Sequence, residues 1–565
     1  MRRCRVPVFV LFSIGLSAAP SPREAAAAEP DADVAATVTM VLTSARHPEM
    51  AWPELPDVVA TLKELYAAEP DHLFWFTDGQ PVPGVASVVR ALALADEHGL
   101  PRADYDADRL LEAWITLRSG APVEPARRAL FDLALTTDVA RLVAAVQHGR
   151  VDPATLRWGY EAVPRSLDRA KVLRDLRGSG DLARLLGELQ PPFSHYARAK
   201  ATLARYKKMA ATEPPLVPAL AKGQKIEPGK PWAGVPALAA RLRALGDLAA
   251  PAAATTPASD GVAYQGAVVE AVKSFQRRHG LEPDGVIGRD TVAALDVSLA
   301  QRVRQLELAM ERMRWLPDMS ERPSVFVNLP LFRLWASDPK TGEEPVRMNV
   351  VVGKSVGHMT PVFLDQMEYV IFRPYWNPPY SIIVKEIVPH ARRDPGYLAR
   401  ENMEIVASGD DSAEALPTTA ENISGVLAGR LRLRQKPGPS NSLGLAKFIF
   451  PNADNIYMHG TPAPQVFARA RRDFSHGCIR LEDPARLAEW VLRDQPEWTR
   501  AKIDAAMQGE RPTRVNLKQK LSVVLFYDTV HVNSEGVVFF VSDIYGDDRQ
   551  LDAVLAQGYP YPTRR

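Results

Sequence analysis

The sequence predicts a multidomain α+β protein with a mainly helical N-terminal scaffold, a three-helix module, and a mostly β domain with a helical capping insertion. The chain has 565 residues, too many for one hydrophobic core, and 46% of them are apolar, which suits several well-packed domains. Apolar residues recur at helical spacing over 34–220, whereas short β-branched and aromatic runs dominate after Pro323. Many of the 48 prolines lie where the pattern changes, as at Pro214, Pro251 and Pro437.

Residues 1–28 have the pattern of a secretory signal peptide. Three arginines in the first five residues form a basic start, residues 6–19 are apolar, and the alanine run 25–28 offers a cleavage site. The apolar run of about 14 residues is short for a bilayer span; the alternative is an uncleaved membrane anchor. Cys4 precedes this run and is badly placed for lipid attachment. We therefore expect a periplasmic or otherwise extracytoplasmic protein with no stable transmembrane segment after processing.

Charge argues against one class of partner. The 69 basic and 67 acidic side chains give a net charge of +2, whereas nucleic-acid binders usually carry a clear basic surplus. No nucleic-acid partner is expected.

Residues 29–221 should form the helical scaffold. Leu62, Leu65 and Tyr66 recur on one helical face, as do several apolar residues between 130 and 143. Gly99 and Gly149 are expected to end helices as C-caps. No polar cluster here suggests catalysis, so the local histidines are expected at the surface or in caps (His72, His98, His148 and His195).

Residues 222–297 should form a separate module with helices at 236–245, 265–279 and from Thr291 to Leu295. The runs Ala-Val-Lys-Ser-Phe-Gln at 271–276 and Asp-Gly-Val-Ile-Gly at 284–288 resemble the three-helix peptidoglycan-binding module of cell-wall enzymes. The resemblance implies contact with glycan or stem peptide. The alternative is a generic three-helix bundle.

Residues 298–322 should connect back to the scaffold as a helix over 299–315. The β domain is expected over 323–495, interrupted by the helical, charged capping insertion at about 383–438. An insertion between core strands often becomes a lid over a site. Residues 496–565 should form an extension whose hairpin pairs 522–527 with 536–542.

Cys478 is the only cysteine beyond the predicted leader, so it has no internal disulfide partner. It lies in the run Ser475-His476-Gly477-Cys478-Ile479-Arg480, less than twenty residues after His459-Gly460. A thiol is a useful nucleophile only as the thiolate, which needs a base or a positive charge nearby.

The neighbours of Cys478 suit acyl transfer. His459 ends an apolar strand, and Gly460 lets the chain turn, so the ring can point toward the loop that holds Cys478. Gly477 lets backbone amides face an incoming carbonyl oxygen, as an oxyanion hole requires. A helix starting near Asp483 should place its positive end near the thiol. These features predict a Cys-His site that forms a covalent thioester.

These residues have three alternative interpretations. His459, His476 and Cys478 could bind zinc, but a structural site takes four ligands and usually paired cysteines. Cys478 could be an inert buried thiol, although its flank suits a loop better than a core. A redox role normally needs a second thiol, and none is present beyond the leader.

The spacing of the two histidine-glycine motifs, His459-Gly460-Thr461-Pro462 and residues 475–480, resembles the signature of the L,D-transpeptidases that cross-link peptidoglycan. Flanking runs extend the resemblance to the long multidomain branch of this family: Arg-Trp-Leu-Pro at 314–317, Pro-Tyr-Trp-Asn-Pro-Pro at 374–379, and Arg-Gln-Lys-Pro-Gly at 434–438. In that branch a helical scaffold, a wall-binding module and a capped catalytic domain occur together.

The resemblance implies a role for each residue of the motif. Cys478 would be the nucleophile, His459 the base, and the Gly460 carbonyl the group that orients the ring. The backbone of His476, Gly477 and Cys478 would form the oxyanion hole. The resemblance further suggests Tyr457, Ser475 and Arg480 as supports of this hole or of substrate, with packing or a surface ion pair as the alternative.

The family reaction would release D-alanine from a tetrapeptide stem and join its third residue to a diaminopimelate amine of another stem, giving a 3-3 cross-link. It implies no cofactor and no metal, acylation by carbapenems, and peptidoglycan stems and glycan as partners. Glycan polymerases and D,D-carboxypeptidases are further expected partners. Hydrolysis, D-amino-acid exchange, lipoprotein attachment and non-catalytic wall binding stay open as alternatives.

Overall fold

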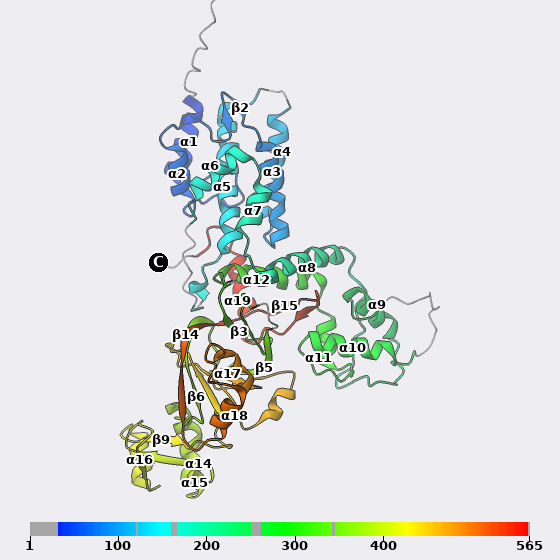
Figure 1. Cartoon of the computed structure of the whole chain (residues 1–565). Helices are drawn as coiled ribbons and strands as arrows, with labels where there is room; N and C mark the ends of the chain where they lie inside the picture. Colours follow the sequence, from blue (N-terminus) through cyan, green and yellow to red (C-terminus); the bar gives the residue numbers. More distant parts are fainter. Residues whose placement is uncertain are drawn as a thin grey trace, which may run out of the picture.

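The computed structural model describes residues 32–119, 122–156, 158–159, 167–249, 262–319, 321–341 and 345–562. The predicted signal peptide, 1–28, lies outside the described residues. Figure 1 shows a helical domain at one end, a sheet domain below it, an insertion at the far end and a three-helix module beside them. The predicted multidomain α+β class is confirmed.

The helical domain packs around one long central helix. Helix α5 (Pro125–His148) is buried around most of its circumference, because its apolar residues are not confined to one stripe. Gly149 ends α5 and Gly99 ends the 3-10 helix η1 (Leu92–His98), so both predicted C-caps are confirmed. The surrounding helices are α1 (Ala32–Ser44), α2 (Val59–Tyr66), α3 (Val85–Ala91), α4 (Ala107–Leu117), α6 (Arg169–Ser179) and α7 (Leu182–Leu189).

Two further helices, α8 (Ser194–Ala210) and α12 (Leu299–Trp315), lie between the helical and sheet domains (Figure 1). Ser298 and Gln301 form a capping box that fixes the start of α12. The prediction of a connecting helix over 299–315 is therefore confirmed.

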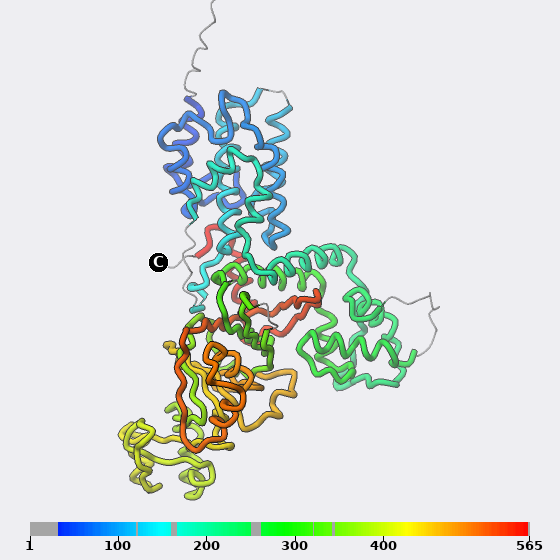
Figure 2. The backbone as a smooth tube through the Cα atoms, viewed as in Figure 1, coloured from blue at the N-terminus to red at the C-terminus, as the bar shows by residue number. Residues whose placement is uncertain are grey.

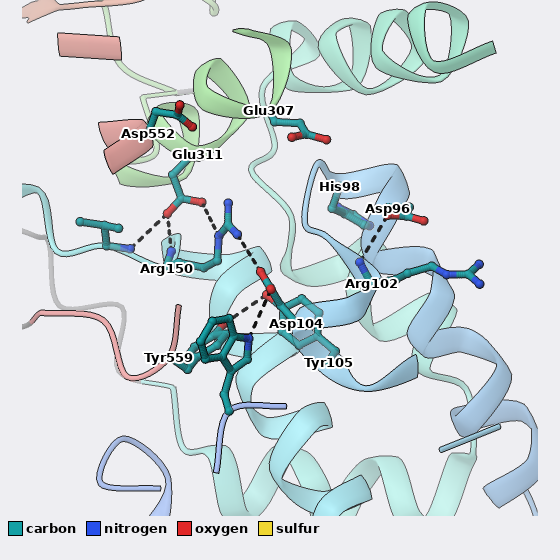
Figure 3. A network of polar contacts seen from close by, with 12 residues as sticks. Asp96, His98, Arg102, Asp104, Tyr105, Arg150, Glu307, Glu311, Asp552 and Tyr559 are labelled. Atoms are coloured by element: carbon teal, nitrogen blue, oxygen red, sulfur yellow. Dashed lines mark hydrogen bonds and ion pairs between the residues drawn. The ribbon is translucent and has the colours of Figure 1, made fainter. Parts of the chain in front are cut away.

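A buried ionic network joins α12 to the helical domain (Figure 3). The Glu311 carboxylate accepts hydrogen bonds from the Val151 amide at 3.2 Å and from Arg314 Nη1 at 3.0 Å, and it pairs with Arg150. Arg150 also donates to Asp104 at 3.3 Å. The side chains of Arg150, Glu311 and Arg314 are at most 1% exposed, so this network fixes the two domains against each other.

His98, expected at the surface or in a cap, is the last residue of η1 before its C-cap Gly99, but it is buried there. It is 2% exposed, and its Nδ1 lies 3.2 Å from the Tyr196 hydroxyl of α8. Helix α8 covers the end of η1, which sequence periodicity within either helix could not reveal. His195 is also covered, because it stacks on His531 of the C-terminal segment at 4.8 Å.

The small module contains three helices around its own core: α9 (Val235–Leu245), α10 (Ala267–Arg278) and α11 (Arg289–Leu295). Leu238, Leu242, Val272 and Phe275 are fully buried at its centre. All three predicted helices are confirmed, and each helix end lies within two residues of its predicted position.

The sheet domain is a barrel-like sheet of nine strands. Its order is β12-β5-β13-β11-β10-β6-β14-β3-β4, and an added pairing of β4 with β5 closes the sheet on itself. The strands are β3 (Ser324–Asn328), β4 (Arg333–Ser337), β5 (Val346–Gly353), β6 (Phe363–Phe372), β10 (Ala446–Ile449), β11 (Met458–His459), β12 (Asp473–Ser475), β13 (Ile479–Leu481) and β14 (Thr513–Phe526). Closure removes most exposed strand edges and encloses the apolar core.

The capping insertion between β6 and β10 holds the expected helices, but short strands that the sequence did not predict accompany them. It holds a three-stranded sheet, β8-β7-β9, beside its short helices and has its own apolar core. The strands hold two to four residues, too few to give a clear alternation in a charged segment. The elements are α13 (Tyr380–Ile382), the π-helix η4 (Ile383–Ile387), α14 (Val388–Arg393), α15 (Tyr397–Arg400), β7 (Met403–Val406), β8 (Ala415–Leu416), α16 (Ala420–Leu427) and β9 (Arg432–Gln435).

The predicted C-terminal hairpin is also wrong in one strand. Residues 522–527 belong largely to β14, which pairs antiparallel with β6 and parallel with β3 inside the barrel-like sheet. The hairpin instead joins β15 (Val530–Val532) to β16 (Val538–Phe540). Figure 2 shows this red C-terminal segment returning between the other domains. The sheet thus continues past residue 495, because β14 pairs with strands distant in sequence.

Phe540 of this hairpin is a meeting point of three parts of the chain. It is 1% exposed. The centroid of its ring lies 5.3 Å from that of Tyr206 in α8 and 6.1 Å from that of His279 in the three-helix module. The guanidinium carbon of Arg302, on α12, lies 4.8 Å from the same ring. The hairpin therefore holds the module against the helical domain.

Within the described part of the chain, no helix combines the length and the apolar character needed to cross a membrane.

Candidate active site

Four polar side chains lie on one face of the barrel-like sheet. β11 and β13 pair in parallel, with His459 opposite Arg480. Side chains alternate between the two faces of a sheet, so Tyr457 shares the face of His459, and Cys478 shares that of Arg480. The Ile479 amide donates to the Tyr457 carbonyl at 3.1 Å, which extends the pairing to the residues beside the thiol.

The intervening residues of these strands anchor the site. Met458, Ile479 and Leu481 are at most 1% exposed and point into the apolar core. Their burial favours a single strand register, because a shift by one residue would exchange the two faces. The apolar alternation therefore places the polar side chains together.

His459 is held by the backbone beside it. Its Nδ1 lies 2.6 Å from the Gly460 carbonyl oxygen, the contact that the family resemblance implied. A carbonyl can only accept, so Nδ1 carries the hydrogen, and Nε2 of the neutral ring has a free lone pair. Burial, followed by the charge of Arg480, lowers the pKa of His459 to about 3. The ring is therefore a neutral base near pH 7.

The Cys478 thiol is half-buried, and the surroundings favour its protonated form. Burial raises its pKa, although hydrogen bonding from the Tyr457 backbone and side chain and the charges of Lys447 and Arg480 act in the opposite direction. The sequence suggested an environment that favours the thiolate. The structure instead favours a neutral thiol beside a neutral imidazole, since burial disfavours both charges.

Sγ and the imidazole make separate contacts in this arrangement. Sγ lies 3.9 Å from the Asn455 carbonyl oxygen, and within the described residues no hydrogen bond joins it to the His459 ring. Catalytic hydrogen bonds are often long in ligand-free sites and shorten when substrate binds. The site therefore shows no preformed ion pair between the thiol and the imidazole among the described residues.

Tyr457 links the thiol to the capping insertion. Its pKa is raised by burial and by the neighbouring Cys478, while hydrogen bonding from Trp376 acts in the opposite direction. Trp376 itself pairs with Gln435 at the end of β9. In the sequence Trp376 is only part of a flanking motif, and its contact with Tyr457 requires the tertiary structure.

Gly477 makes the turn directly before Cys478. Its φ is +116°, and a Cβ atom there would lie 3.3 Å from Ile456 Cδ1, so both backbone conformation and space favour glycine. Thr360 Oγ1 donates to the Gly477 carbonyl at 2.6 Å, and Tyr545 of the C-terminal extension lies against Thr360. These supports were not apparent from the sequence.

The amides around this turn differ in availability. The Gly477 amide donates to Ser475 Oγ at 3.2 Å, and Ser475 Oγ donates to the Cys478 carbonyl at 2.6 Å. The Gly477 amide therefore stabilises the turn. It is not free to bind an oxyanion, although the family resemblance implied that it would be. Within the described residues, the amides of His476 and Cys478 donate to no other group. Ser475 acts on the loop itself.

The His476 side chain faces the capping insertion. Its Nε2 lies 2.7 Å from Glu386 Oε1 in η4, and its ring lies 4.7 Å from that of His358. His459 and His476 thus face different partners. Among the described residues, no group of three or more histidine, cysteine, aspartate or glutamate side chains could hold a metal ion.

Arg480 presents a cation beside the thiol. Burial lowers its pKa, and the neighbouring Cys478 acts in the opposite direction. Its Nε is buried and has no hydrogen-bond partner among the described residues. An unpaired donor in this position could meet an anionic or carbonyl group of a substrate.

The predicted helix after Asp483 is α17 (Pro484–Val491), capped by the Asp483 side chain. A Cβ atom on Gly460 would lie 3.3 Å from Pro484 Cγ, so the start of α17 packs beside the base. The sequence predicts that the positive end of this helix lies near the thiol; in the structure its first residue, Pro484, lies beside Gly460.

Comparison with known proteins gives three family matches along the chain. Residues 322–515 match the model of the L,D-transpeptidase catalytic domain. Residues 60–203 match that of a scaffold domain, and residues 233–295 match that of a peptidoglycan binding domain, itself a provisional assignment.

One curated relative comes from Haemophilus influenzae, and its name assigns it provisionally to the L,D-transpeptidases. It is 29% identical over 249 residues, which cover 44% of this chain and 49% of the relative. The match therefore spans about half the length of that protein.

Proposed function

Because this chain carries the catalytic domain of the L,D-transpeptidase family and a peptidoglycan-binding domain, we propose that it cross-links peptidoglycan stems through Cys478. The observation that carries the proposal is the strand pairing that puts Tyr457, His459, Cys478 and Arg480 on one face. The neutral His459 ring supplies the base that such a reaction needs.

The first half-reaction acylates the enzyme. The Sγ proton passes to His459 Nε2 as Sγ attacks the carbonyl carbon of the third stem residue. The C–N bond to D-alanine then breaks, and the proton on Nε2 passes to the leaving amine. A thioester on Cys478 and free D-alanine result. The free amides of His476 and Cys478 are the donors best placed for the oxyanion.

The second half-reaction restores the thiol. The neutral amine of a diaminopimelate side chain on another stem attacks the thioester carbon and gives a proton to His459. The C–S bond breaks, and Sγ takes the proton back. The net change exchanges one amide for another and forms a 3-3 cross-link, so neither half-reaction uses an oxidant or an energy source.

Incubation of the purified protein with tetrapeptide muropeptides, followed by mass spectrometry, tests this proposal. Cross-linked dimers with released D-alanine are expected. Tripeptide monomers would indicate hydrolysis, D-amino-acid incorporation would indicate exchange, and unchanged muropeptides with retained sedimentation on cell walls would indicate wall binding alone. Any of these three outcomes, without dimers, overturns the cross-linking proposal.

Variants assign the roles within the site. Cys478→Ala should abolish turnover, and His459→Ala should reduce it by at least about a hundredfold, the usual scale for a general base. His72→Ala is the matched control, because that side chain is exposed. Cross-linking by Cys478→Ala would exclude this residue as the nucleophile. Carbapenem acylation is expected as a mass increase on the wild-type chain and not on Cys478→Ala.

We further propose export to the periplasm or another extracytoplasmic space, where the stems lie. A reporter that is active only outside the cytoplasm, fused after residues 1–28, should become active. An inactive reporter would contradict export by this segment.

A further inference from the structure

Lys447 is a charged residue in the middle of an otherwise apolar strand beside the site. It lies in β10 between Ala446 and Phe448, which are fully buried in the core. In the register of β10 and β11, Lys447 stands opposite His459. Strand alternation therefore puts the Lys447 side chain on the face that carries the imidazole and the thiol.

The ammonium group contacts an aromatic ring. Lys447 Nζ lies 3.9 Å from the centroid of the Tyr457 ring, well inside the range of cation–π contacts. Tyr457 in turn hydrogen-bonds toward Cys478 and Trp376. Lys447 thus supports the residue that lies directly against the thiol.

Among the residues that the structure describes, no carboxylate neutralises this cation. In the described part of the chain, Lys447 forms no ion pair, and the charge that favours its protonated form is that of Cys478. A partly buried cation without an acidic partner is uncommon, because it loses hydration without a compensating charge. The negative charge it can compensate arises when Cys478 loses its proton.

We propose that Lys447 is a positioning residue of the thiol site, which holds the Tyr457 ring and offsets the negative charge that develops at Cys478 during acylation. The charged and titratable groups beside it are Tyr457, His459 on β11, Cys478, and Arg480 on β13. On its other side, Ile371 of β6 stands opposite it, with Tyr369 on the same face and Arg514 of β14 over the Tyr369 ring. The inference rests on the proposed role of Cys478 as nucleophile, and it explains how a thiol in a desolvated site is activated.

Thiol alkylation tests the inference without a peptidoglycan substrate. Iodoacetamide is reacted with the purified protein from pH 6 to 10, and modification of Cys478 is quantified by peptide mass spectrometry, so Cys4 does not contribute. Lys447→Met should lower the rate of Cys478 alkylation at pH 7.5 by about 3- to 10-fold. It should also move the inflection of the rate–pH profile upward by roughly half to one pH unit. Lys447→Arg, which keeps the positive charge, should have an alkylation rate and an inflection pH close to those of the wild type.

Lys502→Met is the matched control. It removes another lysine whose Nζ lies 4.5 Å from an aromatic ring, that of Trp498, and its alkylation profile should coincide with the wild type. A Lys447→Met profile that coincides with the wild type in a folded protein overturns the inference. If Lys447→Met does not fold, Lys447→Gln gives the same comparison with a polar side chain.

Turnover gives a second readout. With muropeptide substrate, Lys447→Met should lower kcat with KM nearly unchanged, since the charge acts on the developing thiolate. Failure of the wild-type protein to turn over stems would overturn the proposed function, whereas the alkylation result would still decide the role of Lys447.

Discussion

Glu311 provides the sharpest test of how the domains are held together. Its carboxylate lies between the guanidinium groups of Arg150 and Arg314, and it also accepts hydrogen bonds from two backbone amides. Gly149 leaves room for it, because a Cβ atom there would lie 2.8 Å from Glu311 Oε1. Glu311→Gln keeps the shape of the side chain and removes its charge.

The expected loss follows from burial. Both arginine side chains are at most 1% exposed, so removing the shared anion leaves two buried cations, of which, among the described residues, only Arg150 retains another carboxylate. Breaking a buried ion pair from one side typically costs about 3–5 kcal/mol. We expect a loss of that size in the free energy of unfolding, measured by urea unfolding with circular dichroism at pH 7.

The pH dependence adds a sign. Burial alone would raise the pKa of Glu311, but Arg150, Arg314 and two amides outweigh it and lower the pKa below the ordinary value of a glutamate. A lowered carboxyl pKa stabilises the fold above the unfolded value, and that stability is lost as the pH falls through the folded value. The difference between wild type and Glu311→Gln should therefore be complete at pH 7 and shrink below about pH 4.5.

Asp175→Asn is the control, because it removes an acid from an exposed helical pair with Lys171. Such pairs contribute about 0.3–0.5 kcal/mol. The reasoning is refuted if Glu311→Gln costs less than about 1 kcal/mol, or no more than Asp175→Asn.

Three further predictions concern the site, the hairpin and pH. Gly477→Ala should lower cross-linking by at least about tenfold, because alanine at φ +116° is strained by about 1–3 kcal/mol; unchanged turnover contradicts this. Phe540→Ala should cost about 3–5 kcal/mol and expose the three-helix module to limited proteolysis, whereas the exposed Val537→Ala should do neither. His98 and His279 are buried, and burial lowers both pKa values, to about 3 for His98. His98 should therefore cost roughly 2 kcal/mol of stability between pH 6.5 and pH 5, and His279 should act in the same direction; a thermal midpoint that does not fall over this range contradicts this.

The helices and the site motif could be predicted because their signals are local. The apolar spacing within 235–245 and 267–278 identifies two helices, and Gly99 and Gly149 identify helix ends. The sequence predicts Cys478 and His459 as site residues because both lie beside glycines within a short stretch. Each of these signals depends on residues a few positions apart.

The errors arose where the partner is distant in the sequence. β14 is a barrel strand because it meets β6 and β3, more than a hundred residues away. The short strands of the capping insertion form only when β7 lies between β8 and β9. Hydrogen bonding between such segments leaves little trace in the pattern of either one.

The amino-acid order by itself determined which chemical groups are present, a thiol beside a glycine with a nearby imidazole, and the helical elements around them. Only the tertiary structure decided their state. Burial keeps Cys478 and His459 neutral, and the Gly477 amide is taken by Ser475. Lys447 joins the site from β10. Solvation and charge at an atom depend on everything packed around it, and that packing exists only in the folded chain.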